Sequence, residues 1–246
     1  MAANQSHQFA LYVHNLSSIA CDQKDCVLSD PDLVHRIARV LRLREGDVCV
    51  LFDVAAHWLV QIKQIGKKTI ICHVRSRENN VQYHPALVAW LPLLKRDALE
   101  AAIYSLVEVG VQSIQLVLTE KVQRKWYGQK EYGRLRNIMI AAAEQAKVFL
   151  LPTLHEPQPL PQLLRDQSQE VSLFFDVDGL PLLQAAQQLV DMHKSYTLFV
   201  GPEGDLTDDE KGQLKQNGWL FVRLTPTVLR AQQAMVLAAG AIRSLL

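Results

Sequence analysis

The chain has 246 residues, of which 49% are hydrophobic and 21% are charged, and its formal net charge at pH 7 is +1. This balance is typical of a folded globular protein and excludes a disordered tail protein. The net charge excludes a uniformly basic surface that would attract a polyanion over the whole molecule. Charge is uneven, however, because residues 31–77 carry nine Lys or Arg against four Asp or Glu, a local charge of +5.

The first 76 residues predict short strands around one helix. Residues 8–14 are expected to form a strand, and residues 30–44 a helix with Asp30 as N-cap and Pro31 in the first turn. Three β-rich runs follow, at 48–53, 57–65 and 68–76. One helix among short strands indicates a small β-barrel module.

From about residue 80, apolar strands alternate with helices. The expected strands are 86–94, 113–118, 171–175, 195–200 and 219–224, and the expected helices are 97–110, 130–148, 181–192, 207–217 and 228–246. This alternation is typical of a parallel sheet covered on both faces. The polar segment near residues 76–84 is expected to separate the two domains, 1–78 and 79–246.

Three loops stand at the carboxyl ends of expected strands, where ligands bind in an open α/β sheet. In the loop 201–205, two glycines around a proline let the backbone approach a ligand closely. The same segment is equally compatible with a plain strand-to-helix turn capped by Thr207. The loop 175–179 carries Asp176 and Asp178, but two carboxylates alone are a weak magnesium signal, and no metal is predicted.

The loop 224–230 ends with Arg230 next to the last expected helix. A cation near a helix N-terminus opposes the helix dipole, and this placement is understandable if Arg230 faces an anion. The alternative is a solvated arginine in an ordinary linker.

Five stretches, in this order along the chain, resemble the RsmE family of SPOUT methyltransferases. They are 35–47, 95–111, 142–145, 201–204 and 228–230. That family methylates N3 of a uridine in bacterial 16S ribosomal RNA. The resemblance implies an α/β fold, with a C-terminal SPOUT-type trefoil-knotted parallel-sheet domain preceded by a small PUA-like β-barrel domain. It also implies S-adenosyl-L-methionine as cofactor, a homodimer, and ribosomal RNA or the small ribosomal subunit as partner.

The resemblance further implies site residues. The cofactor would be held by Phe175, Gly201, Pro202, Glu203, Gly204, Leu224, Val228 and Leu229. Arg230 would stabilise charge on the uracil or its phosphate, and Glu203 or Glu144 would accept a proton or bind a ribose hydroxyl. For Glu144, a hydrogen bond to a neighbouring loop is the alternative. RNA would contact Arg36, Arg39, Arg42, Arg44, Lys121, Arg124 and Lys125.

The resemblance is that of a divergent member of this group. Asp205 follows the GPEG segment where the family usually has a second glycine, and Ala231-Gln232-Gln233-Ala234 replaces Thr-Glu-Thr-Ala. Ser105 and Val148 stand where the family usually has lysine and arginine. These departures favour an alternative, a non-catalytic RNA-binding or ribosome-assembly protein on a decayed methyltransferase scaffold. A related enzyme with a shifted target nucleotide is a third hypothesis.

The cysteines and the apolar runs predict the compartment. Cys21, Cys26, Cys49 and Cys72 lack the spacing of a zinc site and are expected to be reduced thiols. The N-terminus lacks the pattern of a signal peptide, and no apolar run approaches the ~20 residues of a membrane span. A cytoplasmic protein without membrane contact is expected.

Overall fold

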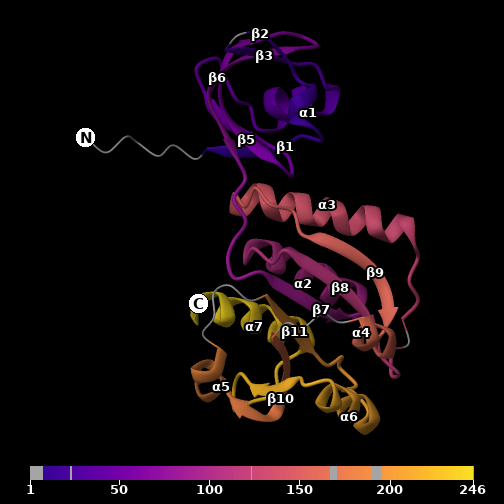
Figure 1. Cartoon of the computed structure of the whole chain (residues 1–246). Helices are drawn as coiled ribbons and strands as arrows, with labels where there is room; N and C mark the ends of the chain where they lie inside the picture. The colour runs from indigo at the N-terminus through magenta and orange to yellow at the C-terminus, as the bar shows by residue number, and fades with distance from the viewer. Residues whose placement is uncertain (1–7, 23, 123, 167–170, 190–194, 246) are drawn as a thin grey trace. The chain divides into compact units, whose positions relative to one another are not determined.

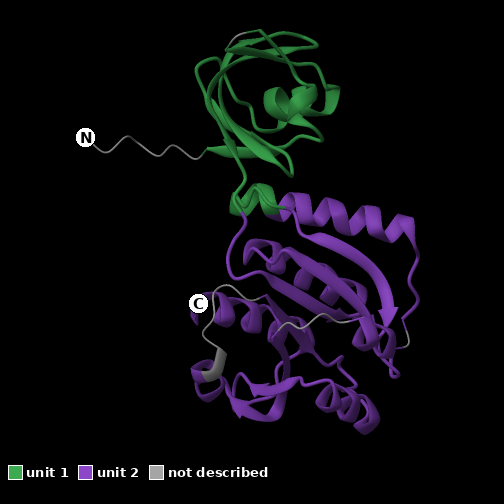
Figure 2. Cartoon of the chain, in the orientation of Figure 1, with its two compact units in different colours: residues 1–81, 143–150 green, residues 82–142, 151–246 purple. Residues whose placement is uncertain are grey.

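The computed structural model describes residues 8–22, 24–122, 124–166, 171–189 and 195–245. The chain forms two compact units (Figure 2). Unit 1 comprises residues 1–81 and 143–150, and unit 2 comprises residues 82–142 and 151–246. Residues 143–150, which the sequence analysis assigned to the second domain, thus group with the first unit.

Unit 1 is a six-stranded sheet in the order β1-β4-β5-β6-β3-β2 (Figure 1). Its strands are β1 (Phe9–Tyr12), β2 (Ala20–Asp22), β3 (Asp25–Leu28), β4 (Val48–Phe52), β5 (Ala56–Ile65) and β6 (Ile70–Asn79). β1 runs parallel to β4, and the other pairs are antiparallel. The sheet closes over a buried apolar cluster that includes Leu51, Val60 and Ile62. This is the β-rich PUA-like module that the sequence predicts.

The helix of unit 1 begins where the sequence predicts and ends earlier. Asp30 accepts a hydrogen bond from the Asp32 amide at 2.9 Å and caps α1 (Pro31–His35), which continues as a π-helical turn, η2 (Arg36–Val40). The predicted extension to residue 44 is wrong, because Arg42 has φ +54° and leaves the helical conformation. The 3₁₀ turn η1 (Leu16–Ser18) and the short strands β2 and β3 were not predicted.

Unit 2 is a second six-stranded sheet, in the order β12-β10-β11-β7-β8-β9, with every neighbouring pair parallel. Its strands are β7 (Leu87–Pro92), β8 (Ser113–Leu118), β9 (Thr153–Pro159), β10 (Val171–Pro181), β11 (Tyr196–Val200) and β12 (Leu220–Arg223). Its helices are α2 (Arg96–Glu108), α3 (Gln129–Ala146), α4 (Leu160–Asp166), α5 (Leu182–Leu189), α6 (Asp208–Gln216) and α7 (Ala231–Leu245). Residues 190–192 of the predicted helix 181–192 lie outside the described residues.

The parallel sheet confirms the predicted fold class, and four of its helices pack in two pairs. α2 contacts α7, which also lies against β7 and β11, while α4 contacts α6. An apolar cluster joins Phe199 of β11 to Leu163 of α4 and Leu214 of α6. β9 and α4 were not predicted. The trefoil knot stays a prediction.

β10 is longer than predicted, and it is irregular. It pairs with β11 only as far as Phe175 and Val200, and its register against β12 shifts between Phe175 and Leu180. We call residues 176–179 the β10 bulge. A Cβ on Gly179 would lie 2.5 Å from the Val222 amide nitrogen, so the β10 and β12 backbones approach closely here.

Within the described part of the chain, no helix has the length and apolar character needed to cross a bilayer. The same residues contain no group of three or more His, Cys, Asp or Glu placed to hold a metal ion.

Candidate active site

A cavity of about 440 Å³ opens in unit 2 where β10, β11 and β12 end. It is lined by residues 175–177, 200–203, 205, 223–225, 227–231 and 234. These residues come from the β10 bulge, the loop after β11, and the loop between β12 and α7. The three segments that the sequence singles out separately therefore meet around one space, as expected for strands whose carboxyl ends share one sheet edge.

The loop after β11 is a tight turn. The Asp205 amide donates to the Pro202 carbonyl at 2.9 Å, and Asp205 has φ +55°, in the left-handed region. A Cβ on Gly201 would lie 3.1 Å from the Asp205 Oδ1 atom. The loop therefore folds back on itself closely enough that Gly201 has little room for a side chain.

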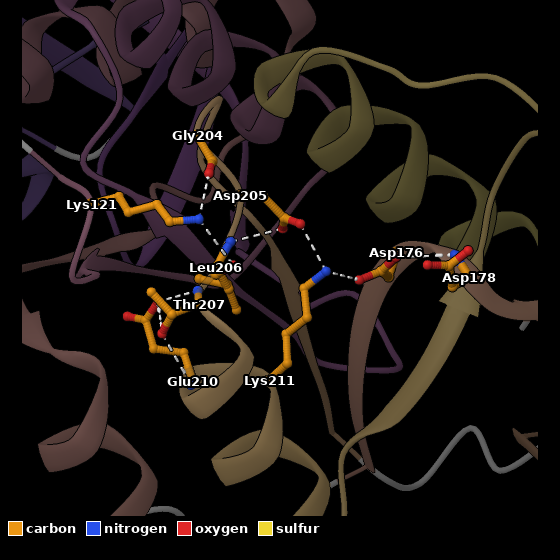
Figure 3. A network of polar contacts seen from close by, with 9 residues as sticks. All are labelled: Lys121, Asp176, Asp178, Gly204, Asp205, Leu206, Thr207, Glu210 and Lys211. Carbon is orange, nitrogen blue, oxygen red and sulfur yellow. Dashed lines mark hydrogen bonds and ion pairs between the residues drawn. The ribbon is translucent and has the colours of Figure 1, made fainter.

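Lys121 fixes this loop from the segment after β8 (Figure 3). Its ammonium donates to the Gly204 carbonyl at 2.9 Å and to the Leu206 carbonyl at 3.3 Å. The loop then enters α6 through a capping box, in which Thr207 and Glu210 exchange hydrogen bonds. Glu210 is 5% exposed and also accepts from the Glu120 amide at 2.8 Å. The segment 201–207 therefore combines the two alternatives that the sequence left open. It is a capped strand-to-helix turn, and it is also a loop that lines the cavity.

The loop after β12 delivers Arg230 to the cavity. The Thr225 hydroxyl donates to the Thr227 carbonyl at 2.7 Å, and Val228 is 84% exposed. The predicted helix start at residue 228 is wrong: α7 begins at Ala231, and the Arg230 carbonyl accepts the Ala234 amide at 2.9 Å. Arg230 is therefore the N-cap residue, with an exposed side chain beside the first, unpaired amides of α7.

Of the residues predicted to hold the cofactor, all but one line the cavity. Those that line the cavity are Phe175, Gly201, Pro202, Glu203, Leu224, Val228 and Leu229, together with Arg230. Gly204 does not line it, and its carbonyl is bound to Lys121.

Glu144 does not line the cavity and belongs to unit 1. Its Oε2 atom accepts from Arg36 Nη2 at 2.5 Å, and its Oε1 atom accepts from the Tyr12 amide at 2.8 Å. Both carboxylate oxygens are engaged, so the catalytic role predicted for Glu144 is withdrawn in favour of the structural alternative.

The four arginines predicted to contact RNA lie in unit 1 and differ in availability. Arg39, Arg42 and Arg44 are exposed. Arg36 is paired with Glu144, with 38% of its side chain exposed. We therefore keep the first three as candidate phosphate contacts and assign Arg36 mainly to the fold.

Two of the three cations predicted after β8 are engaged within the protein. Arg124, whose side chain is 17% exposed, donates to the Leu94 carbonyl and pairs with Glu131. Lys121 holds the loop after β11, as described above. The RNA contact predicted for Arg124 is corrected, because its guanidinium is already bound. Lys125 is exposed and stays a candidate.

Sequence reasoning missed several lining residues, Arg223 among them. Arg223 is the last residue of β12 and lines the cavity. Its position at the end of a predicted strand was the signal that could have identified it. Asp205 was noted only as a departure from a family glycine. Its left-handed φ explains why the family usually has glycine there, since only Gly, Asn and Asp adopt that conformation readily.

Two family models match the chain. The model of the RNA methyltransferase domain covers residues 82–243, and the model of the RNA methyltransferase PUA domain covers residues 28–75. The chain belongs to the RNA methyltransferase family. The likeness to the RsmE group that the sequence analysis states is confirmed by named relatives.

A ribosomal RNA small subunit methyltransferase E from Mycobacterium bovis is 28% identical over 225 residues, covering 87% of this chain and 84% of the relative. Its counterpart from Synechocystis is 29% identical, covering 87% of this chain and 71% of the relative. The crystal structure of ribosomal RNA small subunit methyltransferase E from Neisseria gonorrhoeae, bound to S-adenosyl methionine, matches with a TM-score of 0.82 and 21% identity. That match covers 97% of this chain and 98% of the solved chain and confirms the fold of this RNA methyltransferase.

Proposed function

We propose that this chain transfers a methyl group from S-adenosylmethionine to N3 of a uridine in small-subunit ribosomal RNA. The observation that carries the proposal is the cavity that the β10 bulge and the loops after β11 and β12 form together, in a chain with both family domains. Relatives named ribosomal RNA small subunit methyltransferase E support small-subunit ribosomal RNA as the substrate, and the resemblance to the RsmE family supports N3 of a uridine as the target atom. The homodimer implied by the resemblance stays a prediction.

The residues around the cavity fit this cofactor. The volume of about 440 Å³ lies in the range of small-molecule sites, ~300–1,000 Å³. Phe175, Val200 and Leu229 offer apolar surface for a purine, and Glu203 offers a carboxylate for hydroxyl or ammonium groups. Gly201, Pro202 and Leu224 also line the cavity, and backbone groups there can bind a ligand irrespective of side chain.

When bound, the cofactor supplies a methyl group on a positively charged sulfur. The residues of this chain have to orient the uracil and stabilise the negative charge that develops as its N3 proton leaves. Arg230 stands beside the unpaired amides at the start of α7, so the guanidinium and the helix end add their positive potentials. Such a potential lowers the free energy of a uracil anion. Glu203 is the candidate proton acceptor, because it is exposed and lines the cavity.

Residues 231–234, which differ from the family pattern, are the departure that favours the non-catalytic alternative. Ala231 and Ala234 line the cavity with small apolar side chains, whereas Gln232 and Gln233 do not line it. The lost carboxylate therefore belonged to a position outside the cavity of this chain. The glycine and proline of the loop after β11 are retained and line the cavity, which supports retention of cofactor binding.

Calorimetric titration with S-adenosylmethionine and S-adenosylhomocysteine is the first test. Micromolar binding of both supports the proposal. No binding by a folded protein that still retards RNA in a gel would overturn the enzymatic reading and favour the assembly protein.

The second test uses small ribosomal subunits or 16S RNA from a strain without the modification. Methylation at N3 blocks the Watson–Crick edge of uracil, so reverse transcription should stop at the modified uridine. We expect Arg230→Ala to lower turnover by ~100-fold, as for removal of one charge-stabilising donor. Arg165→Ala, at an exposed position in α4, is the matched control and should leave turnover unchanged. Equal turnover in both variants would remove Arg230 from the mechanism.

A further inference from the structure

Lys211 connects two of the three segments that form the cavity (Figure 3). It lies in the first half of α6, and its ammonium is 2.8 Å from Asp205 Oδ2 in the loop after β11 and 2.7 Å from Asp176 Oδ2 in the β10 bulge. Both aspartates line the cavity, and Lys211 does not. One side chain outside the cavity thus joins two walls of it.

The Asp205 end of this bridge stabilises an unfavourable backbone conformation. Left-handed φ costs about 1–2 kcal/mol for a residue with a Cβ, and aspartate tolerates it through local hydrogen bonds. Here the Oδ1 atom accepts the Leu206 amide at 2.7 Å, while Oδ2 accepts from Lys211. Lys211 therefore orients the carboxylate that keeps the turn closed against Gly201.

The Asp176 end is the more buried one. The side chain of Asp176 is 7% exposed, and its Oδ1 atom accepts the Asp178 amide at 3.0 Å. Burial alone would raise the pKa of Asp176, but the Lys211 ammonium and the Asp178 amide outweigh it and hold this pKa below its usual value. Burial opposes the charge of Lys211 too, yet the two carboxylates raise its pKa above the usual value. Lys211 and Asp176 therefore form an ion pair at neutral pH.

We propose that Lys211 is a positioning residue for cofactor binding, clamping the loop after β11 to the β10 bulge and so presetting the distance between two walls of the cavity. The inference rests on the proposed function, because it takes S-adenosylmethionine as the ligand of this cavity. It explains how this chain carries aspartate at position 205: the cation on α6 makes the left-handed turn stable without glycine.

A purely electrostatic role makes a different prediction. Without Lys211, two carboxylates at the cavity would attract the positively charged sulfur of S-adenosylmethionine and not the neutral sulfur of S-adenosylhomocysteine. A positioning role affects both ligands alike, because both need the same loop. The ratio of the two dissociation constants therefore separates the roles.

The test compares Lys211→Met with Lys215→Met by calorimetric titration. Lys215 is one turn further along α6, and its ammonium lies over the Phe221 ring, so its removal makes the same charge change away from the cavity. We expect Lys211→Met to raise the dissociation constants of both ligands by about tenfold, since the loop must now be ordered on binding, and Lys215→Met to change neither. Unchanged affinities in Lys211→Met, or a change for S-adenosylmethionine alone, would overturn the proposal.

Asp205→Gly completes the experiment as a double-mutant cycle. Glycine adopts the left-handed turn without help, so the tenfold effect of Lys211→Met should fall below about threefold in the Asp205→Gly background. An equal effect in both backgrounds contradicts the clamp.

Amide hydrogen exchange of residues 203–206 gives a readout that needs no cofactor. Faster exchange in Lys211→Met than in Lys215→Met supports the clamp, and equal rates overturn it. If the unaltered protein binds neither ligand, the proposed function fails, and the exchange data still decide the clamp.

Discussion

Glu144 binds Arg36 and the backbone of Tyr12 at once, with contacts of 2.5 Å from Arg36 Nη2 to Oε2 and 2.8 Å from the Tyr12 amide to Oε1. The side chain of Glu144 is 15% exposed. A residue near the end of α3 therefore ties β1 to the start of η2 within unit 1.

Glu144→Ala should lower the free energy of unfolding by about 2 kcal/mol, because a charged acceptor of two hydrogen bonds is lost. The affinity for S-adenosylmethionine should not change, since Glu144 does not line the cavity. Denaturant unfolding and calorimetry measure the two quantities. Glu108→Ala, at an exposed position in α2, is the control. A stable Glu144→Ala variant without cofactor affinity would return Glu144 to the active site.

Gly179→Ala should destabilise unit 2 severely, by more than about 2 kcal/mol, because its Cβ would lie 2.5 Å from the Val222 backbone. Gly212→Ala is the matched contrast. No atom outside the neighbouring backbone of α6 lies within 4 Å of a Cβ there, and the residue is inside this helix, so the substitution should stabilise by ~0.5–1 kcal/mol. Thermal unfolding of both variants, with opposite shifts in Tm, tests the close approach of β10 and β12.

Asp53 should make the stability of unit 1 depend on pH. It is 7% exposed; burial opposes its charge, but the amides of Leu16, Ala55 and Ala56 donate to it and hold its pKa below the usual 3.8. A lowered pKa gives stability that is fully present above the unfolded value and is lost as pH falls through the folded value.

The unaltered protein and Asp53→Asn should therefore differ most in free energy of unfolding near neutral pH. This difference should shrink below about pH 4. Urea unfolding of both proteins between pH 3 and pH 8 measures it. A difference that stays constant into the acid range would contradict the charge assignment.

Arg39 and Arg44 should contribute to RNA affinity, since both are exposed and lie in the segment 31–77, which carries a local charge of +5. If each contacts one phosphate, replacing both with alanine should weaken RNA binding and reduce the slope of log affinity against log salt by about 2. Titrations at several salt concentrations measure the slope. Arg165→Ala should leave it unchanged, and an unchanged slope in the double variant would place the RNA elsewhere.

The four cysteines should differ in reactivity. Cys21 is exposed, whereas Cys26, Cys49 and Cys72 are buried, and burial raises the pKa of Cys49 to about 12. A maleimide should therefore modify one thiol in the folded protein and the remainder only after unfolding. Mass spectrometry counts the adducts, and Cys21→Ser should abolish the native reaction. Rapid labelling of Cys49 in the folded state would contradict its burial.

The sheet of unit 2 was predictable because its strands are short apolar runs and its loops carry Gly, Pro and capping residues. β9 and α4 were missed since residues 152–161 contain four prolines, which obscure both strand and helix patterns. The helix 30–44 was predicted too long, because its apolar spacing continues to Leu43 while the backbone of Arg42 does not.

The site was predictable where backbone and motif coincide, as at Gly201 and Arg230. It was not predictable where a charged side chain binds groups of the protein itself instead of a ligand. Nothing in the spacing of Lys121 or Arg124 distinguishes a cation that binds carbonyl groups from one that awaits phosphate. The partnership of Lys211 with Asp176 joins residues 35 positions apart and arises only from the adjacency of β10 and α6.

All residues that line the cavity lie between positions 175 and 234, whereas unit 1 needs residues up to 150. A ribosome synthesises the chain from its N-terminus, and domains generally fold in that order. Unit 1 can therefore be complete while the segments that form the cavity are still unmade. During its own translation, the chain therefore acquires its candidate RNA-binding arginines first and its candidate cofactor cavity last.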